Sequence, residues 1–161
     1  MLTLLMSTGD DLTVSIKRVM KFLPPLSPLG PVDYVVRRLV NSRRIRAPMG
    51  WGDHKRAWTQ IDKSLDTNNP EYALMAAWSI LEGEVKRKGN SNLAKIGVGR
   101  QLSIVECTSD SLSLSKCEGK LLKKASAQRT DSAHSLERGN GKTTWNTVSF
   151  VLRCANQLHT S

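Results

Sequence analysis

The sequence has few aromatic residues, few cysteines and no long apolar run. Aromatic residues make up only 5% of the 161 positions, and four of the eight are tryptophan. The three cysteines, Cys107, Cys117 and Cys154, are an odd number without CxxC spacing, which argues against a disulfide scaffold and a zinc site. No apolar run approaches the ~18 residues of a membrane-spanning helix, and the opening MLTLLM lacks the basic flank of a signal peptide. We therefore expect an intracellular protein of a reducing compartment, neither secreted nor membrane-spanning.

Motifs of the common enzyme and cofactor classes are also missing. None of the three histidines, His54, His134 and His159, stands near Cys, Asp or Glu at metal-ligand spacing. The chain has no GxSxG motif and no dinucleotide-binding fingerprint, and GNGKTT at 139–144 lacks the first glycine of a phosphate-binding loop. The main expectation is a non-catalytic protein with no cofactor and no metal.

Acidic residues are outnumbered. There are 24 Lys and Arg against 14 Asp and Glu, a net charge of +10. Such a surplus points to an anionic partner, which could be nucleic acid, an acidic membrane surface or an acidic protein, although a soluble protein with a merely basic surface also fits. Residues 1–56 carry ten Lys and Arg against four Asp and Glu, so most of the surplus lies there.

What is present indicates helices. Residues 53–89 predict two helices joined by a short turn. In the second, Asn69 can cap the start, Pro70 suits the first position and Gly89 can close the end. Apolar residues recur along it at helical spacing until its middle turns are apolar nearly all round, which is typical of a buried central helix.

Charged residues are expected to order both ends of this hairpin. Asp53 can cap the first helix. Near the end of the second, Glu82 and Lys86, and likewise Glu84 and Lys88, stand four positions apart, a spacing that favours ion pairs on a helix surface.

The N-terminal region divides at a proline-rich segment. Residues 12–23 show amphipathic helical spacing, and LPPLSPLGP at 23–31 reads as a stiff linker, with a docking peptide as the minor alternative. We expect an N-terminal helix and linker over 1–30 and a helical domain over 31–161.

Residues 31–46, PVDYVVRRLVNSRRIR, combine an apolar helical stripe with clustered arginines. The guanidinium group matches phosphate oxygens in a planar fork, so the cluster favours anion binding over a solvated helix face. Trp51, nearby, is either a base-stacking platform or a packing residue. The predicted anion-binding residues are Arg37, Arg38, Arg43, Arg44, Arg46, Lys55 and Arg56.

The C-terminal half gives weaker signals. Residues 101–116 alternate apolar and polar positions on both sides of TSDS, which predicts one short β-hairpin, with a loop or broken helix as alternatives. Residues 118–137 are weakly helical. A last helix carries Trp145, Val148, Leu152 and Ala155 on one face after a Thr143 or Thr144 cap. The predicted fold is mainly α, a small bundle of four to six helices around the central helical hairpin.

One pair of polar residues, Arg129 and His134, suggests a catalytic mechanism. Arg129 and His134 are separated by four residues, and the chain over 53–160 resembles the HEPN family of small helical ribonucleases, whose signature is Arg-x4–6-His. The resemblance implies that Arg129 stabilises charge on the scissile phosphate and that His134 acts as general acid or base without a metal, in a homodimer.

Three functions follow from these observations. The first is a basic helical protein that binds RNA in an assembly, packaging or accessory role, including that of a viral structural protein. The alternative is a HEPN-like metal-independent ribonuclease. The further alternative is a peripheral membrane or matrix-type protein that uses the same basic patch on anionic lipid. A homo-oligomer is compatible with each.

Overall fold

The computed structural model describes residues 45–50, 52–89, 97–134 and 143–161. The predicted N-terminal helix, the proline-rich linker, the arginines at 37–44 and Trp51 lie outside these residues. The described chain forms one four-residue helix and five longer ones and contains no strand, which confirms the prediction of a mainly α bundle. The helices are α3 (Arg46–Met49), α4 (Lys55–Asp66), α5 (Pro70–Arg87), α6 (Gly97–Ser111), α7 (Lys116–His134) and α8 (Trp145–Thr160).

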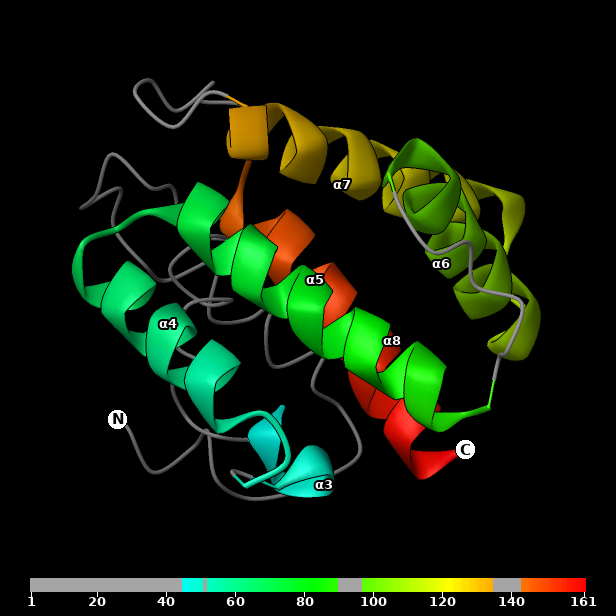
Figure 1. The fold of residues 1–161 in the computed structure, drawn as a ribbon, viewed down its shortest axis with the longest axis horizontal. Helices are drawn as coiled ribbons and strands as arrows, with labels where there is room; N and C mark the ends of the chain where they lie inside the picture. The colour runs from blue at the N-terminus through cyan, green and yellow to red at the C-terminus, as the bar shows by residue number, and fades with distance from the viewer. Residues whose placement is uncertain (1–44, 51, 90–96, 135–142) are drawn as a thin grey trace, which may run out of the picture.

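Helix α5 is the centre of the bundle (Figure 1). Its predicted ends are confirmed: the Asn69 side chain accepts a hydrogen bond from the Tyr72 backbone N–H at 3.1 Å, Pro70 is the first helical residue, and Gly89 has the left-handed φ of 77° that suits glycine after a helix. Half of its residues are buried, on all sides of its middle turns. These are Ala73, Leu74, Ala76, Ala77, Trp78, Ile80, Leu81, Glu84 and Val85.

The neighbours of α5 run in opposite directions. Helix α4 is antiparallel to it, because a short turn joins the two helices and His54 at the start of α4 bonds to Glu84 near the end of α5. Helix α8 is parallel to it, because Trp145 at the start of α8 donates its indole N–H to Asn68 just before α5, and the two helices end together. The start of α4 and the ends of α5 and α8 therefore meet at one end of the bundle.

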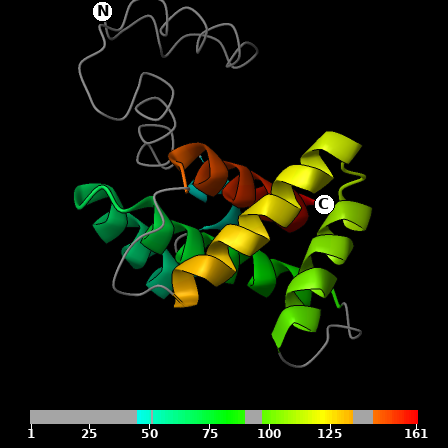
Figure 2. The ribbon, with the colours of Figure 1, turned by 90° about the horizontal axis from the view of Figure 1, so that it is seen from above.

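Helices α6 and α7 form a second helical hairpin, with α6 on the far side of the bundle from α4 (Figure 2). The predicted β-hairpin at 101–116 is wrong. Ile104, Val105 and Thr108 are buried at helical spacing on α6, so helical burial outweighs the local alternation. A turn follows, and Ser115 and Glu118 then form a capping box at the start of α7, with bonds of 2.9 Å and 3.3 Å between backbone N–H groups and side-chain oxygens.

Two predicted caps had different outcomes. Thr144 caps α8 by accepting a hydrogen bond from the Thr147 backbone N–H at 3.4 Å, as predicted. Asp53 does not cap α4. The cap position is held by His54, whose side chain makes no capping bond because it turns toward α5 instead.

Candidate functional site

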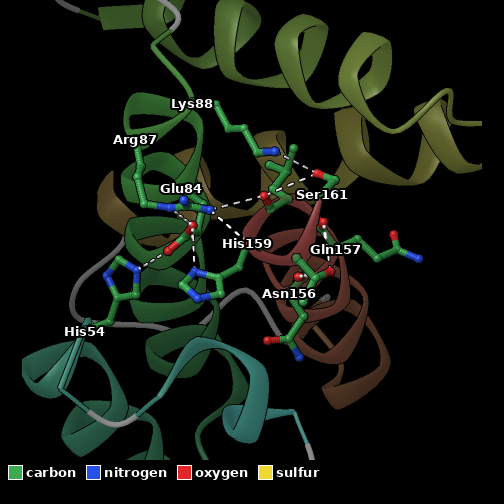
Figure 3. Close-up of polar contacts among 10 residues, drawn as sticks. His54, Glu84, Arg87, Lys88, Asn156, Gln157, His159 and Ser161 are labelled. Atoms are coloured by element: carbon green, nitrogen blue, oxygen red, sulfur yellow. Dashed lines mark hydrogen bonds and ion pairs between the residues drawn. The ribbon is translucent and has the colours of Figure 1, made fainter.

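A buried carboxylate joins three helices where the ends of α5 and α8 meet the start of α4. Glu84 is only 1% exposed, and both of its oxygens are used. Oε1 lies 2.7 Å from His54 Nε2, while Oε2 accepts from Arg87 Nε at 2.7 Å and lies 3.1 Å from His159 Nδ1 (Figure 3). The carboxylate is thus held between two imidazoles and a guanidinium.

The surface ion pairs predicted near the end of α5 are only half correct. Glu82 pairs with Lys86 at 2.8 Å as predicted, and also with Arg100. The predicted pair between Glu84 and Lys88 is wrong, since Glu84 points inward between α4 and α8 and the Lys88 ammonium donates to the Ser161 hydroxyl at 3.0 Å.

The charge state of Glu84 follows from these contacts. Burial on its own raises the pKa of a carboxyl group, but the hydrogen bonds from His54, Arg87 and His159 and the positive charge of Arg87 outweigh it. The pKa of Glu84 is therefore held below its ordinary value of 4.5, and the group is a carboxylate at neutral pH.

Arg87 extends the cluster to the last turn of α8. Its Nη2 donates to the backbone carbonyls of Leu158 and His159, at 3.3 Å and 3.0 Å. Carbonyls in the last turn of a helix have no partner within that helix and form the negative end of its dipole. The guanidinium therefore fastens α8 to α5 and fixes the position of His159.

Gly83 makes room for the His54 ring. A Cβ atom at this position would lie 2.8 Å from His54 Cε1, closer than side-chain carbons pack. Glycine in the middle of a helix costs about 1 kcal/mol relative to alanine. The residue next to Glu84 therefore weakens the helix and lets an imidazole lie against it.

The substitution Gly83→Ala should displace His54. We expect the protein to lose up to about 2 kcal/mol of stability, because an overpacking cost of about 1–3 kcal/mol exceeds the gain in helix propensity. Urea unfolding measures the stability, and the His54 ring signals in NMR report the displacement. Gly119→Ala is the matched control, because the nearest atom to its Cβ is at 4.0 Å and only the helix gain applies. Equal stabilisation by both substitutions would contradict the close contact.

Each imidazole of the cluster keeps one nitrogen for another partner. Among the residues that the structure describes, no group bonds to His54 Nδ1 or to His159 Nε2. The side chains of His54 and His159 are 18% and 23% exposed. Glu84 thus fixes each ring through one nitrogen, and both side chains are partly exposed.

Exposed cations lie on α4 and α5 next to the residues of this cluster in the sequence. Lys55 and Arg56, two of the predicted anion-binding residues, follow His54 in the first turn of α4 and are exposed. Lys86, Arg87 and Lys88 at the end of α5 are exposed as well. We call this surface the basic end, and it consists of His54, Lys55, Arg56, Lys86, Arg87, Lys88 and His159.

Arg46 belongs to the core rather than to this surface. Its side chain is 7% exposed, pairs with Asp62 of α4, and lies over the Trp58 ring with 5.1 Å between the guanidinium carbon and the ring centre. Its charge is engaged inside the protein, so we do not carry Arg46 into the anion-binding proposal. Arg37, Arg38, Arg43 and Arg44 lie outside the described residues.

The HEPN-like pair lies on a single helix. Helix α7 is continuous through Arg129 and His134, its last residue. Five residues at 3.6 per turn separate the two positions by about 140° around the helix axis. Arg129 is half-buried, with a buried Nε that has no hydrogen-bond partner in the described chain. This helical geometry does not bring the two positions onto one face.

Within the described ranges, no group of three or more His, Cys, Asp or Glu residues could hold a metal ion. None of the helices there is long and apolar enough to cross a membrane. The chain matches no family model, no curated protein and no solved structure.

Proposed function

We propose that the protein binds RNA through the basic end of the bundle. The observation that carries the proposal is that exposed cations of α4 and α5 lie at the end of the bundle where these helices share one buried carboxylate. Because His54 and Arg87 both bond to Glu84, the neighbouring Lys55, Arg56 and Lys88 are held at the same end of the molecule. The negative charge of Glu84 is buried and already compensated, so it does not repel phosphates.

The composition of this surface favours a phosphodiester chain over a lipid bilayer. Proteins that lie on membranes insert apolar side chains beside their basic ones. The large hydrophobic residues exposed in the described chain are Tyr72, Leu102 and Leu121, and none belongs to α4, to the end of α5 or to α8. Exposed lysines, guanidinium groups and imidazoles without apolar neighbours suit phosphate oxygens. The binding would serve an assembly, packaging or accessory role.

The salt dependence of RNA binding tests the proposal. Replacing Lys55, Arg56 and Lys88 together with Gln should reduce the slope of log affinity against log salt by about 2, since each phosphate contact on a single strand contributes about 0.7. Filter binding with a labelled single-stranded RNA measures this slope. The variant in which Arg37, Arg38, Arg43 and Arg44 become Gln should flatten the slope further if those arginines extend the same surface.

A control variant that loses the same charge elsewhere distinguishes a localised RNA-binding site from a general effect of net charge. Replacing Lys63, Lys123 and Lys124 with Gln removes the same charge from exposed positions of α4 and α7 outside the basic end. We expect a smaller change in slope. An equal change would show that binding is not localised, and preferential binding to anionic liposomes that RNA cannot displace would favour the membrane alternative.

A further inference from the structure

We infer that His54 and His159 act as a general acid–base pair that cleaves RNA at the basic end. This inference rests on the proposed RNA binding and goes beyond it, because the surface that holds the phosphodiester chain would also cut it.

The pair is held by one group. Glu84 fixes the His54 ring through Nε2 and the His159 ring through Nδ1, at 2.7 Å and 3.1 Å, so the rings lie side by side (Figure 3). A carboxylate behind an imidazole sets its tautomer and orientation and stabilises its protonated form, which is what general acid–base chemistry requires. His54 Nδ1 and His159 Nε2 are the nitrogens left for a substrate.

Two imidazoles fixed on one carboxylate suit phosphodiester transesterification, one acting as the base and the other as the acid. The neutral imidazole takes the proton of the ribose 2′-hydroxyl while that oxygen forms a bond to phosphorus. The imidazolium gives its proton to the 5′ oxygen while the bond between phosphorus and that oxygen breaks. The products are a 2′,3′-cyclic phosphate and a 5′-hydroxyl. The two histidines have exchanged protonation states, and proton exchange with water restores them.

The cations of the basic end would stabilise the reaction. Negative charge develops on the non-bridging oxygens of the phosphate in the transition state, and fixed positive groups lower its energy. Lys55 and Arg56 directly follow His54 in the chain, and Lys88 lies at the end of α5, at the same end of the bundle. Arg87 acts as a positioning residue, because it is bonded to Glu84 and to the backbone of His159.

RNA cleavage by the full chain tests the inference. A labelled single-stranded RNA is incubated with the protein in EDTA, and products are identified by mass. We expect 2′,3′-cyclic phosphate ends from the natural chain and a bell-shaped dependence of rate on pH. His54→Gln and His159→Gln should each lower the rate about 10²–10⁴-fold and each remove one limb of the pH profile, which a merely structural change would not do. Glu106→Gln, an exposed change on α6, is the control.

The outcomes separate this inference from RNA binding. If the natural chain binds RNA without cleaving it, the inference is overturned and the proposed function stands. If RNA is neither bound nor cleaved, both fail. Cleavage of an oligonucleotide lacking the 2′-hydroxyl would overturn the 2′-hydroxyl step. Loss of cleavage in His134→Gln with activity kept in His54→Gln would move the reaction to the HEPN-like motif and overturn the inference. If the histidine variants do not fold, the natural chain still tests the inference. Products without 2′,3′-cyclic phosphate ends, or a rate without a bell-shaped dependence on pH, would overturn it.

Discussion

Replacing Glu84 with alanine should lower the free energy of unfolding by about 1.5–3 kcal/mol, the range for lost hydrogen bonds to a charged group, because the Arg87 left behind is half exposed and stays solvated. The carboxylate contacts His54, Arg87 and His159, which reach it from α4, α5 and α8. Without it, Arg87 and the two imidazoles lose the group that they share, and the three helices lose these bonds. Urea unfolding followed by circular dichroism measures the loss.

An exposed glutamate provides the comparison. Glu106→Ala on α6 should change stability by no more than about 0.5 kcal/mol. A loss below about 1 kcal/mol for Glu84→Ala would mean that the cluster does not hold the three helices together.

The stability contributed by Glu84 should decrease at acid pH. Because the pKa of Glu84 is lowered in the folded protein, its contribution to stability is complete above 4.5, the ordinary value, and is lost as the pH falls through the lowered value. Glu84→Gln has no charge to lose, so the difference in stability from the natural chain should shrink below about pH 5. A difference that stays constant down to pH 3 would contradict the lowered pKa.

Trp78→Ala is the second large effect that we expect, with a loss of about 3–5 kcal/mol. Trp78 is 1% exposed in the middle of α5, where apolar residues surround the helix. Truncation to alanine would leave a cavity that rigid helices on several sides cannot fill. Thermal and urea unfolding measure the effect.

The smaller change Trp78→Phe shows how much of the stability loss in Trp78→Ala comes from the cavity. The Trp78 indole N–H has no hydrogen-bond partner in the described chain, so phenylalanine gives up only ring volume, and we expect a loss below about 1.5 kcal/mol. In Trp145→Phe the bond from Nε1 to Asn68, 3.0 Å long, is lost as well, adding about 1 kcal/mol. Equal losses for Trp78→Ala and Trp78→Phe would contradict the tight packing.

Local signals in the sequence predicted the central part of the fold well. Asn69, Pro70 and Gly89 act within a few residues of themselves, so the ends of α5 follow from the sequence alone. The 101–116 segment was mispredicted because its apolar positions fit both periods over a short window. The choice is made by the burial of Ile104 and Thr108 within the bundle, which is a tertiary effect.

The candidate site could not be predicted in the same way. His54 and Glu84 are 30 positions apart, and Glu84 and His159 are 75 positions apart, so no local motif joins them. The spacing rule that paired Glu84 with Lys88 assumed a solvated helix end, whereas α4 and α8 bury that side of α5. The available signal was Gly83, a glycine inside a strong helix pattern, which often indicates a close approach by another group.

The parallel alignment of α5 and α8 has a consequence for how the native state is reached. Helices α4 and α5 are joined by a short turn and can dock early, whereas α8 must return across a separation of 75 positions. Until α8 docks against α5, His159 does not contact Glu84, the carboxylate that orients its ring. A partly folded chain therefore has the first imidazole without the second, and the complete pair exists only in molecules that have finished folding.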